Sequence, residues 1–337
     1  MYDYLEMAHR CLKLAALGLG KVGSSPMNAW IWTDEQGKIL SEGWLPEVSI
    51  FSKITQNTFT EKPSTDNNLF LCQINHSIED FLILLKQNRI KQVFTAAPTR
   101  QETIRTLEEN QIFIKDKLLP EKETYLNRRF YCFQSQKRPF IILKWAETAD
   151  GFIARTNYDS KWISNPLSRR LVHKWRSEEQ AIMVGTQTAH FDNPRLNVRS
   201  WSGRDPVRVV IDKNLRLVPN LHLFDGSQAT LCYNLKQNKK AENTEWVKIN
   251  EENFLPFFVN VLDDLYRRGI YSIIIEGGAQ LLNFLFEHQL WDEARVFKAP
   301  LNFADGIAAP RVRNAQQIAQ TYLEDNLLTI YQKLNKK

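Results

Sequence analysis

The sequence predicts an α/β protein with two domains, and three observations support this fold class. Short apolar runs rich in β-branched residues alternate along the chain with longer segments whose apolar residues recur at helical spacing. The run Ile273-Ile274-Ile275 is typical of a strand that is buried on both faces of a parallel sheet. The 337 residues are enough for two domains of about 150 residues each.

The first half of the chain predicts a small α/β/α domain. Residues from Asp3 to about Leu19 place their apolar side chains on one side, and Gly20 and Gly23 end this predicted helix. Residues 57–68 are polar and are predicted to form a loop. The other expected elements are strands at 29–32, 39–40, 70–72, 92–95 and 112–114, and helices at 78–85 and 99–109.

The second half repeats the alternation after a basic, proline-containing turn at residues 137–139, so we predict domains at 1–138 and 139–337. Residues 234–245 are rich in Lys, Asn and Gln and are predicted to form a solvated loop. The expected strands are 140–143, 181–185, 207–212, 230–233, 272–275, 295–298 and 328–331, and the expected helices are 253–268 and 281–286.

Composition limits the possible functions. The chain is 43% hydrophobic and 24% charged, as in ordinary soluble proteins, and its net charge of +6 suits small anionic ligands without requiring nucleic acid. No run approaches the roughly 20 apolar residues of a membrane span. The N-terminal stretch contains acids and Lys13, which favours an amphipathic helix over a signal peptide. We therefore expect a cytoplasmic protein.

Glu276-Gly277-Gly278 is the strongest local signal for a binding site. A carboxylate at the end of a buried strand faces the crevice in which α/β proteins bind ligands. The two glycines let backbone N–H groups approach a bound group, and a helix N-terminus follows, so this segment predicts an anion cradle. A tight turn that needs only small residues would explain the same segment equally well.

Seven motifs in order carry a resemblance to a known family. They are residues 143–151, 160–166, 173–176, 184–188, 192–199, 209–212 and 276–278. Over about residues 139 to 312, the chain resembles the reductase half of the bifunctional riboflavin-biosynthesis deaminase–reductase family. The resemblance implies a dihydrofolate-reductase-like α/β fold and NADPH-dependent reduction of 5-amino-6-(5-phosphoribosylamino)uracil. The ribosyl C1′ would take a hydride and become part of a ribityl chain.

The resemblance also implies a role for individual residues. Lys144 and Glu276 match the pair nearest the reacting ribosyl group, and the sequence leaves open which of them passes a proton. The residues that match substrate contacts are Ser160, Arg176, Leu196, Arg199 and Glu276. The residues that match NADPH contacts, or that would cradle a cofactor phosphate, are Ala146, Trp162, Thr188, Asp192, Gly277, Gly278, Ala279 and Gln280.

Lys213 departs from the family, which often has a small hydroxyl residue at this position near the adenosine end of the cofactor. We expect its charge to favour the extra phosphate of NADPH over NADH.

Several of these residues have purely structural explanations. Lys144 within an apolar strand is compatible with a structural ion pair, and Arg176 with a solvated helix face. Trp162 is compatible with a core position. Thr188 is compatible with a helix cap, and Asp192 with the start of a turn.

The first half resembles the deaminase domain of the same family at residues 8–20, 25–28, 42–44 and 126–130. That domain is cytidine-deaminase-like and holds zinc with one His and two Cys beside a glutamate. Here Glu47 has no preceding histidine, and Cys72, followed by His76, lacks its partner cysteine. None of the four widely spaced cysteines has metal-ligand spacing. We therefore expect a degenerate deaminase domain without a metal site.

Alternatives remain open. The chain could be bifunctional, could reduce another phosphoribosyl or pterin-like substrate, or could be a non-catalytic scaffold of the pathway. The resemblance implies a small-molecule phosphoribosylaminopyrimidine substrate and a homodimer, and a separate deaminase is a possible partner. Reduction of an imine and reduction after ring opening are both compatible with the sequence.

Overall fold

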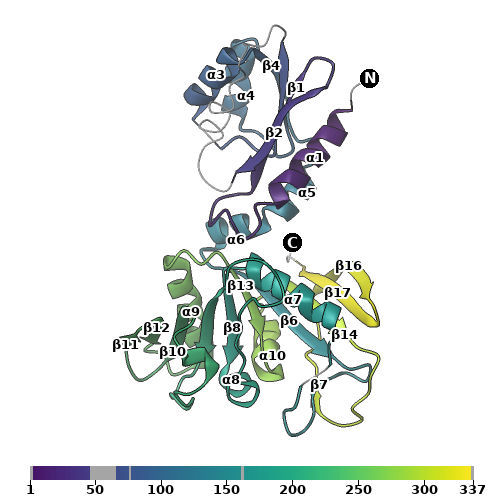
Figure 1. Ribbon diagram of the computed structural model, residues 1–337. Coiled ribbons are helices and arrows are strands. Elements are labelled where there is room, and N and C mark those ends of the chain that lie inside the picture. Colours follow the sequence, from purple (N-terminus) through teal and green to yellow (C-terminus); the bar gives the residue numbers. More distant parts are fainter. Residues whose placement is uncertain (1–2, 46–65, 76, 161–162, 335–337) are drawn as a thin grey trace. The chain divides into compact units, whose positions relative to one another are not determined.

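The computed structural model describes residues 3–45, 66–75, 77–160 and 163–334, in two compact units formed by residues 1–131 and 132–337 (Figure 1). The division falls within helix α6 (Arg128–Gln136). The predicted domain boundary after residue 138 lies shortly after this division, in the turn between α6 and the next strand.

The first unit has a five-stranded sheet in the order β2-β1-β3-β4-β5. Strand β1 pairs antiparallel with β2 and β3, and β3, β4 and β5 are parallel. The strands are β1 (Asn28–Asp34), β2 (Ile39–Leu45), β3 (Asn67–Leu71), β4 (Ile90–Thr95) and β5 (Phe113–Lys115). The helices are α1 (Tyr4–Ala16), α3 (Ile78–Gln87), α4 (Gln101–Glu109) and α5 (Pro120–Leu126).

Side-chain alternation along β1 builds the two cores of this unit. Trp30 and Trp32 pack with apolar residues of α3 and α4, whereas Ala29 and Ile31 pack with α1. Helices therefore cover both faces of the sheet, as the predicted α/β/α arrangement requires.

The second unit is built on a ten-stranded sheet in the order β11-β12-β10-β9-β8-β13-β6-β14-β17-β16. Its central strands are parallel, and β11, β17 and β16 are antiparallel. The strands are β6 (Phe140–Glu147), β8 (Ala181–Gly185), β9 (Val207–Ile211), β10 (Thr230–Asn234), β11 (Lys239–Ala241), β12 (Thr244–Lys248), β13 (Ser272–Glu276), β14 (Glu293–Lys298), β16 (Ala315–Leu323) and β17 (Asn326–Lys333).

Helices and a small two-stranded sheet complete the second unit. The helices are α7 (Pro166–Glu178), α8 (Thr186–Asp192), α9 (Phe254–Arg267) and α10 (Ala279–Glu287), with a 3-10 turn η1 (His222–Phe224). The small sheet pairs β7 (Phe152–Ala154) with β15 (Ile307–Ala308). No helix in the described part of the chain is long and apolar enough to cross a membrane.

The loop predicted at residues 234–245 is wrong, because β11 lies within it and β12 begins at Thr244. Strand β11 is at the edge of the sheet, where exposed lysines stay solvated and keep the strand from pairing with another chain. The polar composition therefore reflects an edge strand. The prediction also omits β16, another exposed edge strand.

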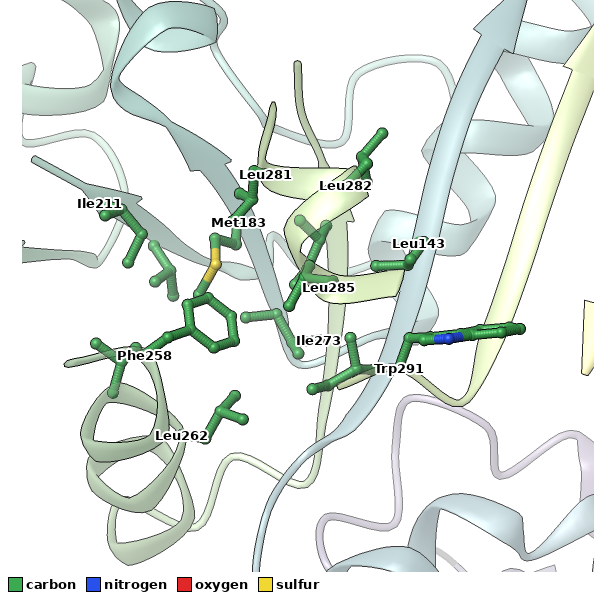
Figure 2. Packing of buried hydrophobic residues seen from close by; sticks show 14 of the residues in the cluster. Leu143, Met183, Ile211, Phe258, Leu262, Ile273, Leu281, Leu282, Leu285 and Trp291 are labelled. Carbon is green, nitrogen blue, oxygen red and sulfur yellow. The ribbon is translucent and has the colours of Figure 1, made fainter. Parts of the chain in front are cut away.

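The central strands bury apolar side chains on both faces, as their β-branched runs predict. Figure 2 shows Leu143, Met183 and Ile273 of the sheet against Phe258 of α9 and Leu285 of α10. On the opposite face, the alternate residues of the same strands pack against α7 and α8, including Ile142, Val184 and Ile274. A polar side chain on one of these strands therefore projects into a layer that a helix covers.

Candidate active site

Lys144 and Glu276 lie side by side because β6 and β13 are parallel and in register, with Glu276 opposite Lys144. Both residues occupy the alternate positions that face α7, in line with Ile142 and Ile274. They also lie near the carboxyl ends of their strands, where the crevices of parallel sheets form. The register of the sheet thus brings together two residues that are far apart in sequence.

Arg176 of α7 holds Glu276 with two parallel hydrogen bonds. Its Nη2 donates to Glu276 Oε2 at 2.8 Å, and its Nε donates to Oε1 at 3.1 Å. The third branch, Nη1, donates to the carbonyl oxygen of Asn197 at 3.2 Å. Burial favours the neutral acid, but Arg176 and Lys144 outweigh it and lower the pKa of Glu276 to about 2. Glu276 is therefore a fixed carboxylate at neutral pH.

Lys144 has no direct partner among the described residues: no hydrogen bond or ion pair there ends on its Nζ. Its Nζ lies 5.8 Å from the ring centroid of Phe297. Burial lowers the pKa of Lys144, Arg176 lowers it further, and Glu276 partly opposes them. A lysine in this state has its donors free for a ligand oxygen and releases a proton more readily than an exposed lysine.

Helix α7 places Arg176 because its N-terminus is anchored. Asn165 Oδ1 accepts the Ser168 N–H at 2.8 Å, and Pro166 occupies the first helical position. The Asn165 side-chain amide also donates to the carbonyl oxygen of Leu323 at 2.7 Å. The helix is therefore fixed to the turn between β16 and β17 at the end where it begins.

His173 precedes Arg176 by one turn of α7, and its Nδ1 lies 3.0 Å from the carbonyl oxygen of Asn197. Burial, Arg176 and Arg199 together lower the pKa of His173 to about 4, so the ring is neutral at pH 7. The pKa of Arg199 is itself lowered, by burial and then by Arg176 and Arg195. Positive charge is thus concentrated around the segment that follows α8.

The Gly277-Gly278 turn joins Glu276 to helix α10. Gly278 has a φ of −64°, and its N–H donates to Thr188 Oγ1 at 2.9 Å. A Cβ at either glycine would meet protein atoms only at ordinary contact distances, the nearest being Thr188 Oγ1 at 3.5 Å. The glycines are thus not needed for an unusual backbone conformation, and their small size leaves open space. Gly278 is the N-cap residue of α10 and has no side chain, so it provides no side-chain acceptor for the first amides of the helix.

A cavity of about 340 Å³ connects these features. Of the predicted site residues, the ones that line it are Lys144, Ala146, Ser160, Thr188, Asp192, Leu196, Glu276, Gly277, Gly278, Ala279 and Gln280. Arg176 and Arg199 do not line the cavity. Arg176 is instead paired with Glu276, which does line it. Trp162 lies outside the described residues.

Lys213 lies away from this cavity. It follows β9, and its Nζ donates to the carbonyl oxygen of Glu252 at 2.5 Å. The same ammonium lies 5.6 Å from the ring centroid of Phe257. In this conformation the lysine contacts the segment that leads into α9.

Sequence reasoning missed several residues that line the cavity, most visibly Tyr158 and Phe191, whose rings stack with centroids 4.3 Å apart. Each is adjacent or nearly adjacent to a residue that the motifs did indicate, Ser160 and Asp192. Their contact joins segments more than thirty residues apart, and no local pattern indicates it.

In the first unit, the segment around Cys72 is held by buried amide and thiol contacts. Asn28 Oδ1 accepts the N–H of Cys72 at 3.1 Å, and Cys72 Sγ lies 3.8 Å from Cys11 Sγ. Within the described residues, no three His, Cys, Asp or Glu side chains are grouped so that they could hold a metal ion. Glu47 and His76 lie outside the described residues.

Comparison with known families and proteins extends these observations. The family described as the RibD C-terminal domain matches residues 139–331. A protein of Aquifex aeolicus named riboflavin biosynthesis protein RibD is 32% identical over 191 residues, which cover 56% of this chain and 54% of that protein. A protein of the same name from Actinobacillus pleuropneumoniae is 27% identical over 326 residues, covering 88% of this chain and 83% of that protein. The match thus spans about half the length of the Aquifex protein.

A solved structure from Thermotoga maritima shares the fold across both units. It is titled a diaminohydroxyphosphoribosylaminopyrimidine deaminase/5-amino-6-(5-phosphoribosylamino)uracil reductase. The TM-score is 0.83 at 23% identity, and the superposition covers 98% of each chain. The predicted fold class, an α/β/α domain followed by a second α/β domain, is therefore confirmed, and both units share the fold of this deaminase/reductase structure.

Proposed function

The chain belongs to the RibD C-terminal domain family, and from this premise we propose that it is an NADPH-dependent 5-amino-6-(5-phosphoribosylamino)uracil reductase of riboflavin biosynthesis. One observation carries the proposal: a free, partly buried Lys144 beside the anchored carboxylate Glu276, in a cavity that also contains the start of α10. Reduction of a sugar carbon needs a proton donor, a fixed charge and a place for the hydride donor.

The residues around the start of α10 fit a dinucleotide cofactor. The Gly277-Gly278 turn leaves space at the cavity wall, and the first amides of α10 and the helix dipole favour a phosphate. Thr188 ties Gly278 to α8, which keeps this wall in place. Ala146, Asp192, Ala279 and Gln280 complete the wall as further candidate contacts. NADPH, when bound, supplies a hydride to the ribosyl C1′.

The acid–base role belongs to Lys144. A carboxyl group with a pKa of about 2 holds no proton at neutral pH, so Glu276 is a poor proton donor. Lys144 has free donors and a lowered pKa, and we assign it the proton that the sugar ring oxygen takes up as the bond from that oxygen to C1′ breaks. Glu276 keeps Lys144 charged and orients the ribosyl group. Ser160 and Leu196 line the cavity as further substrate contacts.

We assign the substrate phosphate to the positive region around Arg199. Arg176 already uses three branches of its guanidinium on Glu276 and Asn197, so its main role is to hold Glu276. Arg199 is exposed. Burial is the largest cause of its lowered pKa, and Arg176 and Arg195 lower it further, which indicates a local excess of positive charge. A phosphate monoester would relieve that excess. The four buried free thiols and the need for NADPH support a cytoplasmic location.

We propose that the first unit has no deaminase activity. The missing histidine and cysteine support this proposal, because catalytic zinc needs three protein ligands. A bifunctional enzyme is the second candidate, favoured by the likeness of the whole chain to a structure titled as a deaminase/reductase. A homodimer and substrate supply by a separate deaminase stay predictions.

The test is NADPH oxidation by the purified full-length protein, with the deaminated and the non-deaminated phosphoribosylaminopyrimidine supplied in parallel. Turnover of the deaminated compound alone is the expected result. Turnover of both, with ammonia released, would replace the proposal with the bifunctional enzyme. Turnover of neither would favour another substrate or a non-catalytic scaffold.

A further inference from the structure

Two aromatic side chains outside the predicted site lie at the cavity and form what we call the aromatic rim, Tyr158 and Phe191. Tyr158 follows β7 in a loop, and Phe191 lies in the last turn of α8. Their rings are 4.3 Å apart between centroids and inclined by 5°, so they stack in parallel. Both residues line the cavity, together with Ser160 and Asp192.

The rim is exposed although it is apolar. Tyr158 is 37% exposed and Phe191 is 50% exposed, and the only aromatic neighbour of this pair within the described residues is His190, in edge contact with Phe191 at 5.0 Å. Paired rings at the wall of a cavity offer a flat surface against which another planar ring can stack. Their exposure means that such a ring can reach them without unfolding the site.

The backbone at Tyr158 has an unfavourable conformation. Its φ is +68°, which a residue with a large side chain rarely adopts. A small turn maintains it: Tyr158 N–H donates to the carbonyl oxygen of Arg155 at 2.9 Å, and Asp159 N–H donates to Asn157 Oδ1 at 3.0 Å. A glycine would fit this position without strain. A strained residue whose ring lies at a cavity indicates a binding role for that ring.

We propose that Tyr158 and Phe191 bind a planar heterocyclic ring of a ligand by stacking. This inference rests on the proposed function, whose two ligands each carry such a ring: the nicotinamide of the cofactor and the pyrimidinedione of the substrate. The rim is a binding and positioning element and takes no part in proton transfer.

The experiment uses the full-length protein with the variants Phe191→Ala and Tyr158→Gly. The glycine variant removes the ring but tolerates the backbone conformation, so its Tm is expected to stay the same or rise. Tyr158→Phe keeps the ring and removes the hydroxyl, and is expected to behave as the unaltered protein. Tyr322→Ala removes a 71% exposed aromatic ring on β16, outside the cavity, and serves as the matched control.

Two measurements show whether the nicotinamide or the pyrimidinedione is the ring that stacks. They are the Kd of NADPH alone, by fluorescence titration, and the KM of the pyrimidine substrate in turnover. Phe191→Ala and Tyr158→Gly are expected to weaken the same one of these constants by about 10-fold to 100-fold, the range of stacking on one aromatic ring. The double variant is expected to weaken that constant by less than the product of the two single fold-changes, because both substitutions disrupt the same stack.

Unchanged constants in both variants of an active enzyme would overturn the stacking proposal and leave the proposed function intact. A loss in Tyr158→Phe equal to that in Tyr158→Gly would also overturn it, because the hydroxyl would then be the binding group. An unaltered protein that neither binds NADPH nor oxidises it would overturn the proposed function, and the rim proposal with it.

Discussion

At the scale of single residues, the site depends on the different protonation of two neighbours. Glu276 is held as a carboxylate by two hydrogen bonds from Arg176, whereas burial lowers the pKa of Lys144. Lys144 therefore releases its proton more readily than an ordinary lysine, and Glu276 does not take up a proton at neutral pH. This difference fits directional proton donation from Lys144 to a ligand. The pH dependence of turnover should therefore come from the lysine.

The first prediction concerns pH. Protonated Lys144 is the active form, so kcat/KM should fall as the pH rises through a pKa below that of an ordinary lysine. Glu276, with a pKa of about 2, should cause no acidic decline in the neutral range. The measurement is a pH–rate profile of the unaltered protein and of Lys144→Arg. The arginine variant, which does not titrate, should be slow and lack the alkaline decline; an unchanged decline would assign it to another group.

The second prediction concerns Glu276. Glu276→Gln keeps the shape but removes the charge that faces Lys144 and Arg176. We expect kcat to fall by about 10²-fold or more, as for loss of a charge close to the reacting groups, with NADPH affinity nearly unchanged. Steady-state kinetics and an NADPH titration test this. As a control, Glu287→Gln changes a carboxylate at the far end of α10 and should leave kcat unchanged.

At the scale of elements, the sequence indicates the buried parallel strands because their apolar runs are short and rich in β-branched residues. It also indicates the strand–glycine–helix turn at residues 276–279. It misses edge strands such as β11 and β16, whose polar residues resemble those of loops. The pairing of Arg176 with Glu276 was likewise beyond local patterns, since it depends on where α7 lies across the sheet.

The third prediction concerns the start of α10. Gly278→Ala adds a methyl group that meets only Thr188 Oγ1, at 3.5 Å, so the free energy of unfolding should change little. The same methyl group enters the cavity wall, so the Kd of NADPH should rise by about 10-fold, the effect of about 1.4 kcal/mol. Thermal unfolding and fluorescence titration give the two values. A lower Tm with unchanged NADPH affinity would show that the glycine serves the fold alone.

The fourth prediction concerns the N-cap of α7. Asn165→Ala removes the side-chain hydrogen bonds to the Ser168 N–H, the Leu323 carbonyl and the Asp325 carboxylate, and should cost about 1–2 kcal/mol of unfolding free energy. Asn253 is the matched control, since it is the N-cap residue of α9 but makes no side-chain capping bond. Urea unfolding of both alanine variants tests this. Equal losses would contradict the capping argument.

At the scale of the whole molecule, one chain joins an α/β/α unit to a larger unit that carries the candidate site. The sequence predicts the absence of deaminase chemistry in the first unit from the missing ligands. That argument is chemical and needs no coordinates, whereas the volume and lining of the cavity depend on contacts across the second unit.

The fifth prediction concerns metal and ammonia. The purified full-length protein should contain well below one zinc per chain by mass spectrometry, and it should release no ammonia from the non-deaminated pyrimidine. Added zinc should not create the activity, because two of the three expected ligands are missing. Ammonia release that depends on zinc would show that other residues of the first unit replace them.

The register of the second sheet has a consequence for how the chain can evolve. Glu276, Lys144 and Arg295 stand opposite one another on three adjacent strands. Because side chains alternate in direction, a one-residue slip of β13 would carry Glu276 to the opposite face, away from Arg176. Insertions and deletions near β6, β13 and β14 are therefore tolerated only where the adjoining loop absorbs them completely. Length variation among descendants of this chain should accumulate far from these three strands, even where the intervening sequence is free to drift.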